Sequence, residues 1–114
     1  YIKNESYMLG ELLFKKLNQL SISNNAKLIV ISLGFDRFSD WSHIQEKLSK
    51  NFLINKEKFF RNNNISFIDL GDDLVKKTKN NLKYITIKDD GHPNSKGAEI
   101  IGELSCKYLK REFN

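Results

Sequence analysis

Two carboxylates and a histidine lie within four residues near the end of the chain, in the stretch KDDGHPNSKGAEIIGEL. Asp89 stands three positions before His92. At this spacing a tight turn brings the carboxylate to the imidazole Nδ1 and leaves Nε2 free to take a proton. Gly91 permits a sharp backbone, and Pro93 fixes the chain as it leaves the histidine. The arrangement predicts a general base, which needs a nucleophile as its partner.

A helix start is the simpler interpretation of the same residues. Asp, Asn and Ser are common just before a helix, because their side chains accept hydrogen bonds from free backbone N–H groups. Carboxylates near the first turn also stabilise a helix through a favourable interaction with its dipole. A segment of helical periodicity does follow, from about Ser95. On this interpretation the acid–histidine cluster performs no chemistry.

The stretch DDGHPNSKGAEIIGEL resembles the last conserved block of the SGNH (GDSL) hydrolase family, which reads D-x-x-H-P followed by a helix that starts with small residues. The resemblance implies that His92 is the base of a Ser-His-Asp triad and that Asp89 orients it. It implies that Gly97 lies where the helix packs near the site. It further implies a three-layer flavodoxin-like α/β fold and cleavage or transfer of an acyl group on a small-molecule or carbohydrate ester, with no metal or organic cofactor.

The chain departs from the family pattern in the nucleophile. It contains no G-D-S motif, and no G-x-N-D block to supply an oxyanion-hole Asn. The segment Gly71–Leu74 (GDDL) imitates the serine motif with Asp73 in place of Ser, and we expect Asp72 or Asp73 to cap a helix instead. Residues 1–114 are therefore expected to form the C-terminal part of a single SGNH hydrolase-like domain. The serine would lie within roughly 90 upstream residues of the parent, at about 30 residues per βα unit, so these residues alone should be inactive.

Helical periodicity alternates with short apolar runs along the chain. The periodicity predicts helices over Ser6–Leu20, Asp40–Arg61, Asp72–Asn80 and Ser95–Glu112. The β-branched run Leu28–Leu33 is typical of a strand buried on both faces of a parallel sheet, and Ile65–Leu70 is a second short strand. Tyr84–Ile87 is a short strand or an extended loop. The order predicts an α/β layered fold. Two strands leave apolar edges uncovered, so we expect part of the sheet to lie outside this sequence.

Composition and residue spacing limit which kinds of membrane segment, disulfide and metal site the chain can contain. No apolar run reaches the roughly 20 residues that cross a bilayer, so no membrane segment is expected. The single cysteine, Cys106, excludes an internal disulfide and a multi-cysteine zinc site, and we expect it to pack within a helix. Trp41 and the Phe-rich segment after it are interpreted as core packing, with an acyl-chain wall as the alternative. A metal site would need loops to converge, and no ligand spacing predicts one from Asp36, Asp40, Asp89, Asp90 and His92.

The formal net charge of +5 is compatible with an acidic partner. However, the lysines are scattered among asparagines and form no stripe with arginine and aromatic residues, which disfavours nucleic-acid binding. Besides the hydrolase, two alternatives remain: a non-catalytic α/β interaction module and a basic domain that binds an anionic polymer. The sequence leaves the cellular compartment open.

Overall fold

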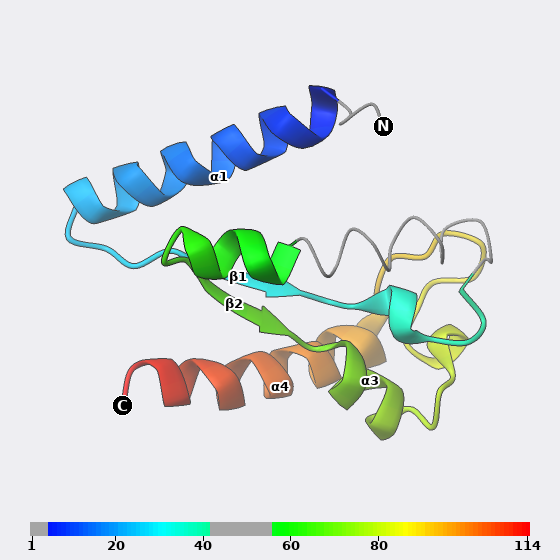
Figure 1. Cartoon of the computed structure of the whole chain (residues 1–114). Helices are drawn as coiled ribbons and strands as arrows, with labels where there is room; N and C mark the ends of the chain where they lie inside the picture. Colours follow the sequence, from blue (N-terminus) through cyan, green and yellow to red (C-terminus); the bar gives the residue numbers. More distant parts are fainter. Residues whose placement is uncertain (1–4, 42–55) are drawn as a thin grey trace.

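Two parallel strands form the centre of the computed structural model, which describes residues 5–41 and 56–114 (Figure 1). Strand β1 (Ile29–Ser32) pairs with β2 (Ser66–Asp69), Ile29 opposite Ser66 and Ser32 opposite Asp69. β-Branched and aromatic residues favour the extended backbone in both strands. The described chain is therefore a mixed α/β structure with a parallel sheet, as the alternation of patterns predicts.

Helices cover both faces of this sheet (Figure 1). On one side lie α1 (Glu5–Ser23) and a helical segment at residues 56–62. On the other side lie α3 (Gly71–Lys77) and α4 (Ser95–Glu112). Short 3-10 turns lie in two of the connections, η1 (Phe35–Arg37) and η2 (Leu82–Tyr84).

The alternation of side chains along β2 divides the interior into two regions, because successive strand residues point to opposite faces. Ile68 and Leu70 join the main core under α3 and α4, whose buried members are Phe38, Ile68, Leu70, Leu74, Leu82, Ile85, Ile100 and Leu104. Phe67, the residue before Ile68, points the other way and stacks on Phe60, with ring centroids 4.9 Å apart. The second region, under α1, is thus aromatic.

Four sequence predictions agree with these elements apart from their ends. The helix predicted over Ser6–Leu20 is α1, and the one over Ser95–Glu112 is α4. The runs Leu28–Leu33 and Ile65–Leu70 contain β1 and β2. Burial on both faces is wrong for β1, all four residues of which are half-buried, because β2 is its single strand neighbour in the described sheet.

Two other element predictions need correction, and the choice left open for a third segment is decided. The helix predicted over Asp40–Arg61 holds for the part at 56–61, whereas Asp40 and Trp41 lie in a turn and 42–55 lie outside the described residues. The helix predicted to reach Asn80 ends at Lys77. Tyr84–Ile87 is not a strand: Tyr84 closes η2, and Thr86 forms a single antiparallel bridge with Pro93.

The expected packing of Cys106 is also wrong, since its thiol is exposed. Positions two apart lie on opposite sides of a helix. The buried side of α4 carries Gly97, Ile100 and Leu104, so Cys106 faces away from the core.

Helix α1 is amphipathic, but its leucines do not face the sheet. Five of them, with exposed fractions from 49% to 60%, form an outward surface that we call the leucine stripe: Leu9, Leu12, Leu13, Leu17 and Leu20. The side chain that packs inward is Phe14, whose ring meets Phe60 edge-on at 5.0 Å. The pattern therefore predicts the helix correctly and leaves open which side it buries.

Two glycines of α4 provide a test of this packing. A Cβ at Gly97 would lie 2.2 Å from the carbonyl oxygen of Ile85, whereas one at Gly102 would meet nothing within 4 Å. We expect Gly97→Ala to lower the free energy of unfolding by about 1–3 kcal/mol through overpacking. Gly102→Ala should raise it by about 0.5–1 kcal/mol through helix propensity. Urea denaturation followed by circular dichroism measures both, and equal stabilities would contradict the described contact.

Candidate functional site

The predicted acid–histidine cluster lies on the loop between η2 and α4, at the end of the sheet toward which both strands point (Figure 1). Backbone hydrogen bonds close this loop at two levels. The N–H of Ile87 donates to the carbonyl of His92 at 2.8 Å, and the N–H of Asn94 donates to the carbonyl of Ile85 at 2.9 Å. The backbone of His92 is therefore fixed although its side chain is 80% exposed.

Asn94 performs the helix-start chemistry. Its Oδ1 accepts a hydrogen bond from the N–H of Gly97 at 2.9 Å, as expected of an N-cap. Its Nδ2 donates back to the carbonyls of Tyr84 and Thr86 at 3.1 and 3.2 Å. Capping thus accounts for Asn94, and the carboxylates and imidazole before it take no part in it.

The imidazole of His92 has a carboxylate partner, and that partner is Asp90. Asp90 Oδ1 contacts His92 Nδ1 and also accepts the backbone N–H of His92 at 3.3 Å. A carboxylate that binds the N–H two residues on forms an Asx turn, which explains how so short a side chain reaches the ring. The hydrogen bond to Asp90, and then its negative charge, raise the pKa of His92. The pKa of Asp90 is lowered in return.

We expected Asp89 in this position, and the structure places it elsewhere. Asp89 has a left-handed backbone with φ 60°, as does Gly91 with φ 82°. The two left-handed residues on either side of Asp90 curl the chain so that Asp90 is turned back onto the ring. The carboxylate of Asp89 makes no hydrogen bond to any described residue, and it lines a cavity of ≈ 800 Å³ together with Asp40 and Lys83.

A second charged cluster, which the sequence does not predict, ties the ends of the two strands together. Arg37 Nη2 lies 3.2 Å from Asp69 Oδ2, and its Nη1 lies 2.8 Å from Asp72 Oδ1. Asp69 also accepts the N–H of Gly71 at 2.8 Å. Arg37 and Asp69 are far apart in sequence, but each follows or ends a strand, and parallel neighbours end at one edge of a sheet. That shared position is the signal that could have found them.

Neither Asp72 nor Asp73 caps α3, so that expectation is wrong. The N-cap position is Leu70, which has no side-chain cap. Asp72 pairs with Arg37, and Asp73 accepts a hydrogen bond from the Tyr108 hydroxyl at 2.5 Å. The two carboxylates connect α3 to η1 and to α4.

Metal ligation and membrane insertion find no support in the described chain. Within residues 5–41 and 56–114, no group of three or more His, Cys, Asp or Glu side chains could hold a metal ion. No helix there combines the length and the apolar character needed to cross a bilayer.

No protein-family model matches this chain, and neither the curated proteins nor the solved structures contain a match. His92 presents an exposed imidazole with a carboxylate on Nδ1, which is the arrangement of an oriented general base. No Ser or Thr among the described residues hydrogen-bonds to this imidazole.

The Asp90–His92 contact is tested by replacing each carboxylate in turn. Asp90→Asn weakens the hydrogen bond and removes the charge that together raise the pKa of His92, so that pKa should fall toward the value of about 6.5 found for an unperturbed histidine. Asp89→Asn is the matched control and should leave it nearly unchanged. Proton NMR of the imidazole against pH measures both, and a larger fall in the Asp89 variant would assign the partner to Asp89.

The same shifts fix a pH window for stability. Because the pKa of His92 is raised in the folded chain, its contribution is complete below the unfolded value and is lost as pH rises through the folded one. The lowered pKa of Asp90 contributes above the unfolded value of a carboxyl and is lost as pH falls through the folded value. The difference in free energy of unfolding between the wild type and Asp90→Asn should therefore be greatest in mildly acidic solution. It should decline as the pH is raised or lowered from there.

Removing Arg37 tests the second cluster. The side chains of Arg37 and Asp69 are 30% and 12% exposed, so Arg37→Met strands a largely buried carboxylate. We expect a loss of about 1–2 kcal/mol in the free energy of unfolding. Lys77→Met breaks the exposed pair with Glu103, 3.1 Å apart, and should cost less than about 1 kcal/mol. Urea denaturation that ranks the two variants the other way would remove the structural role of Arg37.

Proposed function

We propose that this chain is the C-terminal part of an SGNH-type ester hydrolase or acyl transferase, with His92 as its general base. The observation that carries the proposal is the exposed His92 imidazole held at Nδ1 by a carboxylate, on a loop whose capping needs are already met by Asn94. The proposed assignment to the SGNH family rests on the D-x-x-H-P sequence at residues 89–93.

The mechanism follows from the roles of these groups. A serine hydroxyl from the parent's upstream segment attacks the ester carbonyl while His92 Nε2 takes its proton. The imidazolium then returns that proton to the departing alcohol, and the acyl group stays on the serine. Water, or a second hydroxyl, removes the acyl group in the reverse sequence. A carboxylate at Nδ1 holds the tautomer and stabilises the charged ring throughout.

The identity of that carboxylate distinguishes the family resemblance from the geometry. The resemblance assigns Asp89, three positions before His92, whereas Asp90 is the residue in contact with the ring.

The whole natural protein that contains this chain is the material for the test, assayed with a short-chain nitrophenyl ester. His92→Ala should lower kcat/KM by at least about 10²–10⁴. Asp89→Asn and Asp90→Asn form a matched pair, and the one that lowers kcat marks the orienting acid. Activity that survives His92→Ala intact would remove His92 from the mechanism. The upstream sequence gives an independent check, since a strand followed by Gly-Asp-Ser should precede Tyr1 by roughly 90 residues.

The leucine stripe of α1 favours one alternative, a non-catalytic α/β interaction module. Exposed apolar surfaces of this kind mark interaction sites, and five leucines of one helix are about half exposed or more. An unrelated domain upstream of Tyr1, together with no ester hydrolysis by the whole protein, would favour the module over the hydrolase.

A further inference from the structure

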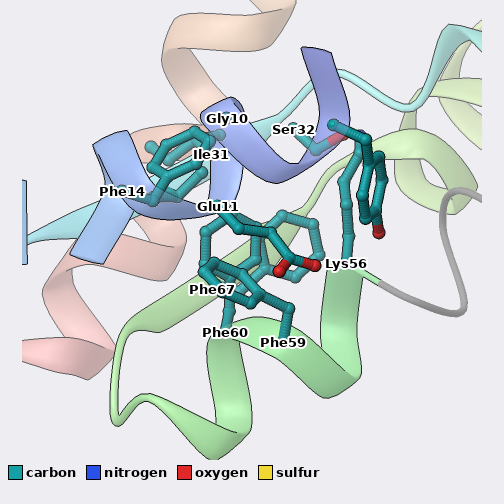
Figure 2. Close-up of a pocket in the computed structure, with 11 residues that line it drawn as sticks. Gly10, Glu11, Phe14, Ile31, Ser32, Lys56, Phe59, Phe60 and Phe67 are labelled. Atoms are coloured by element: carbon teal, nitrogen blue, oxygen red, sulfur yellow. The ribbon is translucent and has the colours of Figure 1, made fainter. Parts of the chain in front are cut away.

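The two faces of the sheet are packed unequally. Under α3 and α4 the core is closed, and Leu70, Leu74 and Ile85 have no exposed surface. Under α1 lies a cavity of ≈ 310 Å³, between that helix, the two strands and the helical segment at 56–62 (Figure 2). Trp41 packs against the closed core as expected, whereas the Phe-rich segment lines the cavity.

Aromatic rings give this cavity a preformed wall. Phe60 meets Phe14 edge-on at 5.0 Å and Phe59 at 5.3 Å, and it stacks on Phe67 at 4.9 Å. Such pairs prefer these geometries. Each ring of the wall is held by another ring, so the wall keeps its shape when the cavity is empty.

The polar side chains of the lining are those of Tyr7, Glu11, Ser32 and Lys56. In Figure 2 Ser32 and Lys56 lie on one side of the cavity, and Phe14 and Ile31 on the other. Ser32 is the last residue of β1, so this polar end lies at the edge of the sheet toward which the His92 loop is placed. Burial lowers the pKa of the Lys56 ammonium, while Asp36 and Asp69 act in the opposite direction, as expected beside apolar surroundings.

The wall that α1 contributes to the cavity is about 10 Å long, because Tyr7 and Phe14 both line it and seven residues of α-helix span that length. A methylene group needs roughly the 30 Å³ that a water molecule occupies in the liquid, so the volume admits a chain of about eight to ten carbons. Pockets that bind small molecules have this apolar character, with a few polar groups that fix orientation.

We propose that this cavity binds the straight alkyl chain of a medium-length acyl group, with its carbonyl end beside Ser32. The identification of the chain as an acyl group rests on the proposed ester chemistry. The phenyl rings offer an apolar surface to a hydrocarbon chain, and the polar side near Ser32 and Lys56 takes the oxygen atoms.

Gly10 offers a way to fill the cavity. It lines the space from α1, and a Cβ there would meet nothing within 4 Å. Gly10→Leu therefore places a side chain where the ligand would lie. Gly102→Leu is the matched control, since Gly102 is also an open helical glycine but lies on α4.

The experiment titrates the whole natural protein that contains this chain with monomeric decanoic acid in a calorimeter, with acetate as the short-chain comparison. Wild type and Gly102→Leu should bind decanoate saturably and with equal affinity, and acetate should not bind. Gly10→Leu should weaken decanoate binding at least tenfold. Absence of saturable binding, or equal affinity in the Gly10 variant, would overturn the proposal.

A second measurement covers the case in which Gly10→Leu perturbs the fold. Nuclear Overhauser effects from the methyl end of decanoate should reach the ring protons of Phe60 and Phe67 in the wild-type complex. Contacts confined to other residues would overturn the proposal. A failure of the proposed ester function would look different. A protein without esterase activity would still bind decanoate, and Gly10→Leu would still block that binding. Conversely, esterase activity that depends on His92 but keeps its chain-length preference in Gly10→Leu would support the ester function and overturn the role of the cavity in acyl binding.

Discussion

The parallel pairing of β1 with β2 is the constraint on which the rest of the structure depends. It brings the ends of both strands to one edge, and the N–H of Leu70 extends the pairing by donating to the carbonyl of Ser32 at 2.9 Å. The connections that leave this edge then touch, since a Cβ at Gly34 would lie 2.5 Å from the Cα of Gly71. Gly34 has φ 61°, so a side chain there would be strained as well as crowded. The ion pairs of Arg37 with Asp69 and Asp72 hold the two connections together as well.

The sheet and the candidate base are coupled through the helix that follows the loop. α4 packs on the closed core through Ile100 and Leu104, and Asn94 ties its first turn to the backbone of the preceding loop. His92 is thus held from the carboxyl side by a rigid helix, while its ring stands in solvent. In the function proposed above, such a base would have a fixed backbone and a free reactive face, which is what a nucleophile approaching from another segment requires.

The sequence predicts the kind and order of the main elements well, because periodicity reports burial on one side of a helix or strand. It could not predict that Phe14 rather than the leucines of α1 faces the sheet, since both kinds of residue are apolar and only the tertiary arrangement chooses between them. It places the acid–histidine cluster correctly on a loop before α4. It could not choose between Asp89 and Asp90, because that choice depends on two left-handed backbone angles that residue types permit without requiring. The Arg37 cluster depends on strand pairing, which no local pattern records.

The leucine stripe of α1 has a consequence for how the chain behaves in solution. A net charge of +5 keeps copies of the chain apart, while the half-exposed leucines favour contact between them. Added salt shortens the electrostatic range from about 30 Å at 0.01 M to about 8 Å at physiological ionic strength. Ionic strength therefore sets the balance between colloidal repulsion and adhesion, and it governs the solubility of this chain wherever nothing covers that helix.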